Sequence, residues 1–138
     1  MKSIHALVIS VAVLGLATEA DAQARRRSTV VPGELRLSGG RRTPEAVRFL
    51  LERNHARVHV CYDTALRTNA TLAGTQIVRF VIEPDGVVSS ATAGERTMSD
   101  PTMVSCVLQT FSALRFVPTP NASTTVTYTL RFVPGVVR

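Results

Sequence analysis

Hydrophobic residues recur at helical spacing over residues 43–68. Thr43, Pro44 and Glu45 form a helix start, with a hydroxyl cap, a first-turn proline that needs no donor, and an acid near the positive end of the helix dipole. The pattern predicts one helix that continues to about Thr68. Because spacings of three and four place side chains on one face, the apolar stripe consists of Val47, Leu50, Leu51, Val58, Cys61, Tyr62 and Ala65.

Four residues of this helix need a separate explanation. Asn54 falls inside the apolar stripe and requires a hydrogen-bond partner if it is buried. Phe49, Ala56 and Val60 fall on the opposite side, which the same core cannot reach. They form either a surface for a partner or a set of ordinary, scattered exposed apolar residues.

A second helical pattern follows Ser99, Asp100 and Pro101, which repeat the signals of a helix start. This helix is expected to end before Pro118. Its apolar stripe consists of Met103, Cys106, Val107, Thr110, Phe111 and Leu114.

Alternating patterns predict three strands. Residues 74–93 form a hairpin, in which the segment from Glu83 to Gly86 suits a type I turn with a bulge. Residues 124–133 alternate strictly, which is typical of a strand with one buried and one wet face. Its apolar face consists of Val126, Tyr128, Leu130 and Phe132, and its polar face of Thr125, Thr127, Thr129 and Arg131.

The order helix, strand, strand, helix, strand predicts a two-layer α+β domain over residues 43–134. A three-stranded antiparallel sheet cannot stand alone, so both amphipathic helices are expected to cover one face of it. Residues 23–42 form a basic flexible tail, with at most a short extended piece at residues 34–37.

Residues 1–22 fit a secretory signal peptide. Lys2 precedes a short apolar run, and Ala20, Asp21 and Ala22 make a small-x-small cleavage site. The run is too short to cross a bilayer, although an uncleaved anchor remains the alternative. We therefore expect a periplasmic or secreted protein without a stable membrane span after signal removal.

The chain is basic, with a formal net charge of +6, and removal of residues 1–22 would take away one basic and two acidic residues. After export, the anionic partners within reach are a membrane surface, a polysaccharide or an acidic protein. There is no Trp and aromatic residues make up only 5% of the chain, so a base-stacking platform is absent and nucleic acid is not expected as a partner.

Two cysteines, Cys61 and Cys106, lie in an exported chain, where an even count suggests pairing. Each falls in the apolar stripe of one predicted helix, so a bridge would join the two helices. Closing a loop of about 45 residues would stabilise the fold by roughly 4 kcal/mol before strain is subtracted. The alternative is two separate buried thiols that act as small hydrophobes.

The segments "CYDTALRTNATLAGTQIVRFVIEPDGVV", "DPTMVSCVLQTFSALRF" and "TVTYTLRF" carry a resemblance to a known family. Over residues 47–134 the chain resembles the TonB-like C-terminal domain of the AgmX/PglI group. The shared features are a Cys-Tyr in the first helix, a hairpin turn, a second Cys in the next helix and a terminal strand. The resemblance implies a disulfide between Cys61 and Cys106, a TonB-like sheet, and pairing of a partner strand on a sheet edge.

The sequence shows no enzymatic motif and implies no cofactor. His55 and His59 are four residues apart, with Glu52 and Asp63 on the same flank, a spacing that can hold a metal. The Glu of H-E-x-x-H is missing, so a solvated, charge-mixed face is the favoured interpretation, with His59 and Asp63 paired across one turn. We expect neither a metal site nor an active site.

The function expected is therefore that of an exported, non-enzymatic protein-interaction module of the bacterial cell envelope. Its last strand, if it lies at a sheet edge, could accept a partner strand by main-chain pairing. The partner-binding residues would be Val126, Thr127, Tyr128, Thr129, Leu130 and Arg131. The partner is an envelope protein of unknown identity or a second copy of the chain.

The alternative function is that of a basic module that binds an anionic cell-wall or surface polymer. Its binding residues would be Arg25, Arg26, Arg27, Arg41 and Arg42.

Overall fold

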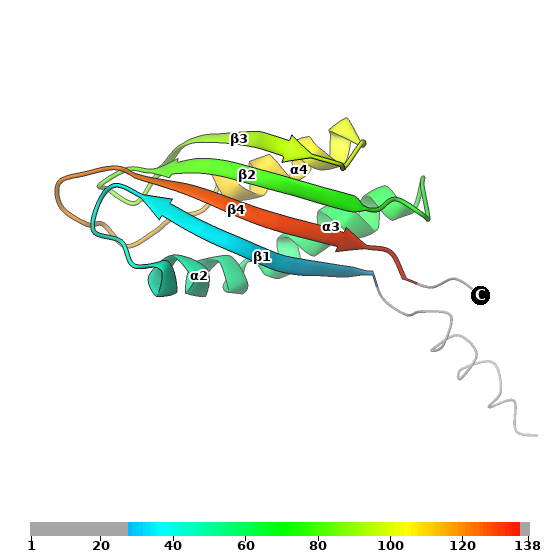
Figure 1. Cartoon of the computed structure of the whole chain (residues 1–138), viewed down its shortest axis with the longest axis horizontal. Coiled ribbons are helices and arrows are strands. Elements are labelled where there is room, and N and C mark those ends of the chain that lie inside the picture. The colour runs from blue at the N-terminus through cyan, green and yellow to red at the C-terminus, as the bar shows by residue number, and fades with distance from the viewer. Residues whose placement is uncertain (1–27, 136–138) are drawn as a thin grey trace, which may run out of the picture.

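The computed structural model describes residues 28–135. Figure 1 shows the helices gathered on one face of a single sheet. The elements in chain order are β1 (Thr29–Ser38), α2 (Pro44–Arg53), α3 (His55–Leu66), β2 (Gly74–Ile82), β3 (Val88–Arg96), α4 (Pro101–Ser112) and β4 (Thr124–Val133). The predicted signal peptide and residues 23–27 of the predicted tail lie outside the described residues.

The two-layer α+β architecture is confirmed, but the predicted number of elements is wrong. The sheet has four strands in the order β1-β4-β2-β3, and every neighbouring pair is antiparallel. In the view of Figure 1, α3 and α4 pass behind the strands and α2 lies next to β1. The sequence prediction missed a strand in the supposed tail and treated two helices as one.

The missed strand is β1, whose alternating pattern is obscured by Pro32 and Gly33. They interrupt an alternating pattern, and the pairing register with β4 also shifts between Pro32 and Leu35. Val30 is nevertheless only 3% exposed, and Leu35 and Leu37 pack against the core. The strand forms because β4 supplies main-chain hydrogen bonds that no local pattern reveals.

The predicted first helix is interrupted at Asn54. This residue has φ −101° and ψ 4°, outside helical values, and it ends α2 and begins α3. Its Nδ2 donates a hydrogen bond to the Leu50 carbonyl at 2.9 Å, which is the partner that a half-buried asparagine in an apolar stripe needs. Asparagine competes for backbone groups in this way, which explains why the break falls here.

The hairpin turn is confirmed. The Gly86 amide donates to the Glu83 carbonyl at 2.9 Å, and the Glu83 amide donates to the Val87 carbonyl at 2.8 Å. Gly86 has φ +89°, and a Cβ there would lie 1.9 Å from the Phe116 carbonyl oxygen. Glycine is therefore required by both the backbone conformation and the close passage of the chain before β4.

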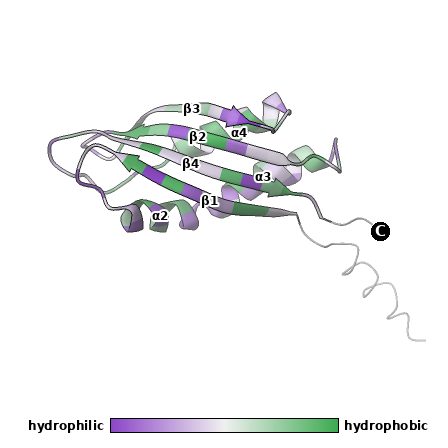
Figure 2. Cartoon of the chain, viewed as in Figure 1, coloured by the Kyte–Doolittle hydropathy of each residue, from purple (hydrophilic) through white to green (hydrophobic). Residues whose placement is uncertain are grey.

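The core lies between the helices and the inner face of the sheet. Hydrophobic and hydrophilic residues alternate along the second half of β1 in Figure 2. Burial alternates along β4 from residue to residue, as expected for a strand with one buried face. The predicted stripes are confirmed: most of their members are buried, with Leu50, Cys106 and Thr110 half-buried. The buried side chains of β2 and β4 are Gln76, Val78, Phe80, Ile82, Thr124, Val126, Tyr128, Leu130 and Phe132.

The two cysteines form a disulfide between α3 and α4. The Cα atoms of Cys61 and Cys106 are 5.8 Å apart, and the described residues include no free cysteine. The bridge joins the two helices across the layer that covers the sheet. The alternative of two separate thiols is therefore excluded.

Candidate functional site

The predicted partner-binding strand does not lie at an edge. β4 pairs with β1 along one side and with β2 along the other, so that Tyr128 stands opposite both Leu35 and Val78. The prediction of an edge position is wrong because β1, placed in a flexible tail by the sequence analysis, occupies that edge. Val126, Tyr128 and Leu130 point into the core, at 0%, 3% and 1% exposure. Contact of residues 126–131 with a partner stays a prediction, and main-chain pairing of a partner strand with β4 requires β1 to leave first.

The described sheet has two outer edges, and β1 forms the more protected one. Pro32 has no amide proton to donate, and the irregular register between Pro32 and Leu35 bends the strand. Glu34 and Arg36 add an exposed ion pair of 2.6 Å. Proline, bulges and charges are the devices that keep an edge from pairing with another chain, so β1 is poorly suited to accept a strand.

The opposite edge, β3, has register shifts toward its two ends, where the β2 partners change between Val81 and Ile82 and between Gln76 and Val78. Between these shifts, from Ser90 to Ala93, its pairing is regular. It contains no proline, and Ser89, Ser90 and Thr92 are exposed while Ala91 and Ala93 pack inward. Charged residues come only at its end, at Glu95 and Arg96. Within residues 28–135 no strand pairs with the outer side of β3. This strand presents small side chains and a row of main-chain groups.

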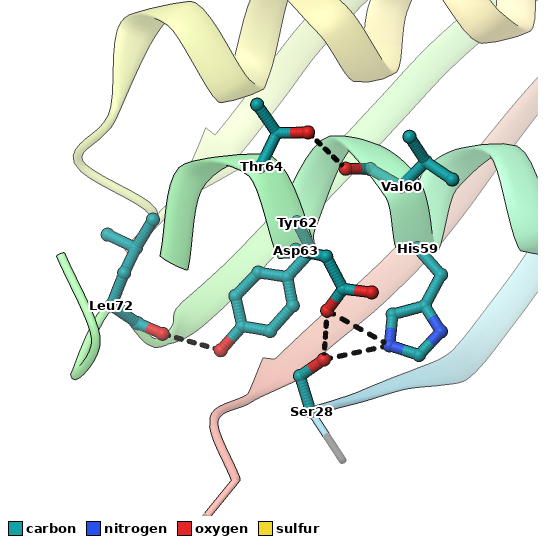
Figure 3. A network of polar contacts seen from close by, with 7 residues as sticks. All are labelled: Ser28, His59, Val60, Tyr62, Asp63, Thr64 and Leu72. Atoms are coloured by element: carbon teal, nitrogen blue, oxygen red, sulfur yellow. Dashed lines mark hydrogen bonds and ion pairs between the residues drawn. The ribbon is translucent and has the colours of Figure 1, made fainter. Parts of the chain in front are cut away.

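A cluster of three polar side chains joins the start of β1 to α3 (Figure 3). The Ser28 hydroxyl donates to Asp63 Oδ1 and lies 2.9 Å from His59 Nε2. The distance from His59 Nε2 to Asp63 Oδ1 is 3.6 Å, so the predicted pairing across one helical turn is confirmed.

This Ser-His-Asp cluster does not have the geometry of a catalytic triad. In a triad the serine contacts one imidazole nitrogen while the carboxylate orients the other. Here both Ser28 and Asp63 approach the same nitrogen, Nε2. The arrangement orients no base toward a nucleophile, and it fastens the first residues of the described chain to α3.

The candidate metal ligands are not brought together. Although His55 and His59 are one turn apart, the chain from Ser28 to Gly135 contains no group of three or more His, Cys, Asp or Glu side chains placed to hold a metal ion. His59 instead contacts Ser28 and Asp63.

The arginines of the alternative prediction fall into two groups. Arg25, Arg26 and Arg27 lie outside the described residues. Arg41 and Arg42 line a groove beside the start of α2. Arg42 donates to the Val117 carbonyl at 2.6 Å and the Glu83 carbonyl at 3.1 Å, and its guanidinium lies 5.8 Å from the centre of the Phe116 ring. Burial lowers the pKa of Arg42, which still leaves this guanidinium charged at neutral pH.

No protein-family model, curated protein or solved structure matches this chain. In the described part of the chain, no helix has the length and apolar character needed to cross a bilayer.

Proposed function

We propose that this chain is an exported, non-enzymatic protein-interaction module of the bacterial cell envelope that pairs a partner strand on the open edge of its sheet. The observation that carries the proposal is the unpaired outer side of β3, which has small exposed side chains and no proline. An extended peptide gains main-chain hydrogen bonds by adding to such an edge.

Two further observations support export. The disulfide between Cys61 and Cys106 suits an oxidising compartment, and the apolar leader at residues 1–22 suits a secretory route. The proposal keeps the likeness to TonB-like domains as its family expectation and moves the docking edge from β4 to β3.

Site-specific photo-crosslinking in the native envelope tests this proposal. A photoreactive residue replaces Thr92 in β3, and the matched control replaces Glu34 in β1, because both positions are exposed and lie on opposite edges of the sheet. We expect a discrete adduct from position 92 and none from position 34.

The alternative outcomes are equally informative. Adducts at position 34, or at both positions alike, would place the docking surface elsewhere and overturn the β3 assignment. A cell-envelope adduct that proves to be a second copy of the chain would identify edge-to-edge pairing as the interaction. No adduct at either position would remove the support for strand pairing.

A further inference from the structure

A groove of about 410 Å³ lies between α2 and the segment that leads from α4 into β4. Its apolar wall includes Phe49, Leu50, Phe116 and Val117. Phe49 is 62% exposed and Val117 is 80% exposed, so two large apolar side chains face water at the same opening. A volume of this size falls in the range of about 300–1,000 Å³ that is usual for binding pockets.

Four arginines surround this apolar wall: Arg41, Arg42, Arg53 and Arg115. The residues that line the groove include no acid, and none of the four arginines forms an ion pair with a carboxylate between Ser28 and Gly135. The nearby carboxylate of Glu83 is held elsewhere, by the Ser89 and Ser123 hydroxyls at 2.6 Å each. The positive charge of the groove is therefore not balanced by its own surroundings.

Three of the four arginines, Arg42, Arg53 and Arg115, are also held in place. The Arg53 guanidinium lies 5.7 Å from the centre of the Phe49 ring, and Arg42 is fixed by two backbone carbonyls and the Phe116 ring. Arg115 donates to the Leu114 carbonyl at 2.9 Å. A guanidinium that stacks on an aromatic ring loses little further freedom when it binds a carboxylate, which favours recognition of an anion beside an apolar group.

We propose that this Arg42 groove binds an acidic peptide segment of a partner protein, with an apolar side chain against Phe49 and Val117 and carboxylates against the arginines. The apolar wall disfavours a polysaccharide, and the open rim leaves an acyl chain in water. A second copy of this basic chain would bring further positive charge to the groove. This surface is separate from the β3 edge, because its residues come from α2 and the segment before β4.

The test is a titration of the purified full chain with a fluorescent peptide that carries Phe and Leu one helical turn apart among four Glu. The comparison peptides replace Glu by Gln, or Phe and Leu by Ala. We expect saturable binding of the acidic peptide, weakened at least about tenfold by either replacement and weakened by salt.

Two variants of the chain locate the binding, and each has a matched control. Phe49→Ala and Arg53→Gln remove one apolar and one charged contact from the groove. Val60→Ala and Arg57→Gln change exposed residues on α3, outside it. We expect each groove variant to weaken binding about tenfold, with the controls unchanged.

Three outcomes would overturn the proposal. The first is equal loss of binding in the groove and control variants, and the second is undiminished binding of the Gln peptide. The third is binding of anionic phosphatidylglycerol vesicles through Phe49 and Arg53 without any binding of the acidic peptide. Since the β3 edge is untouched in all four variants, crosslinking at position 92 stays unchanged whichever result is found.

Discussion

Two polar side chains in the core, Tyr62 and Gln76, differ in how their hydrogen-bonding groups are used. Both are fully buried. The Tyr62 hydroxyl donates to the Leu72 carbonyl, whereas neither amide atom of Gln76 has a partner in the described structure. A buried polar group without a partner costs free energy, so these two residues are expected to respond oppositely to removal of their polar atoms.

Replacing Gln76 by methionine should stabilise the fold. Methionine nearly conserves the volume and removes the unpaired amide, so we expect the free energy of unfolding to rise by about 1–3 kcal/mol. Denaturation by urea, monitored by circular dichroism, measures the change. A lower stability of the Gln76→Met variant would show that the amide has a partner, such as a bound water.

The Tyr62→Phe substitution should change the dependence of stability on pH. Burial, and secondarily the charge of Asp63, raises the pKa of Tyr62 from 10.0 to about 12. The neutral phenol therefore stabilises the fold fully below pH 10, and this contribution is lost as the pH rises through the folded-state pKa.

The Tyr62→Phe variant should be less stable at pH 7 by about 1 kcal/mol, because it loses the hydrogen bond to Leu72. Its stability should also fall less steeply than that of the wild type between pH 10 and 12, as urea denaturation across this range would show. Equal dependence of stability on pH in the two proteins would contradict the assignment of this effect to Tyr62. Tyr128 is present in both proteins, so it does not account for a difference between them.

At the scale of elements, the disulfide is the strongest single constraint between helices. It joins α3 to α4 across a sequence separation of 45 residues. The double variant Cys61→Ala, Cys106→Ala should lose up to roughly 4 kcal/mol of stability, because its unfolded chain regains the freedom that the bridge removes. A reducing agent should lower the stability of the wild type by a similar amount and leave the variant unchanged. Equal stability of wild type and variant would mean that the bridge adds strain as large as its benefit.

The elements that could be predicted are those whose signals are local. Thr43 and Asp100 cap α2 and α4 as expected, and β4 begins and ends where strict alternation does. The break at Asn54 was missed because one asparagine leaves the helical spacing intact. The strand β1 was missed because Pro32 and Gly33 obscure its alternation, and its stability depends on a partner strand at the other end of the chain.

The candidate site shows the same limit. The disulfide could be inferred, because Cys61 and Cys106 each lie in the stripe of one helix. The open edge at β3 could not be inferred from the sequence, since the order of strands in a sheet depends on long-range pairing and not on the pattern within any strand. The Arg42 groove brings Phe49 together with Val117, residues on separate elements, and exposed apolar residues on one helix gave only a weak signal for it.

At the scale of the whole molecule, the two sheet edges differ in their capacity to pair. Successive residues of β3 direct their amides alternately toward β2 and outward. One of the two neighbours Ala91 and Thr92 therefore has its N–H on the free side.

Proline substitution at these two positions should separate folding from binding. The variant with proline on the free side should keep most of its stability but lose the partner. The variant with proline on the β2 side should lose about 3 kcal/mol or more of its free energy of unfolding. Thermal denaturation and recovery of the crosslinked partner measure the two effects. Retention of the partner by the stable proline variant would argue against pairing along β3.

The pairing of β1 with β4 joins the first described segment to the last. A ribosome or an export channel delivers the chain from its amino end, so β1 emerges long before β4 can accept it. Until then β2 also lacks its inner neighbour, and the sheet exists only as the β2–β3 hairpin. Completion of the sheet therefore waits for the final strand, and a chain that terminates before residue 124 loses the centre of its sheet, however intact its other segments are.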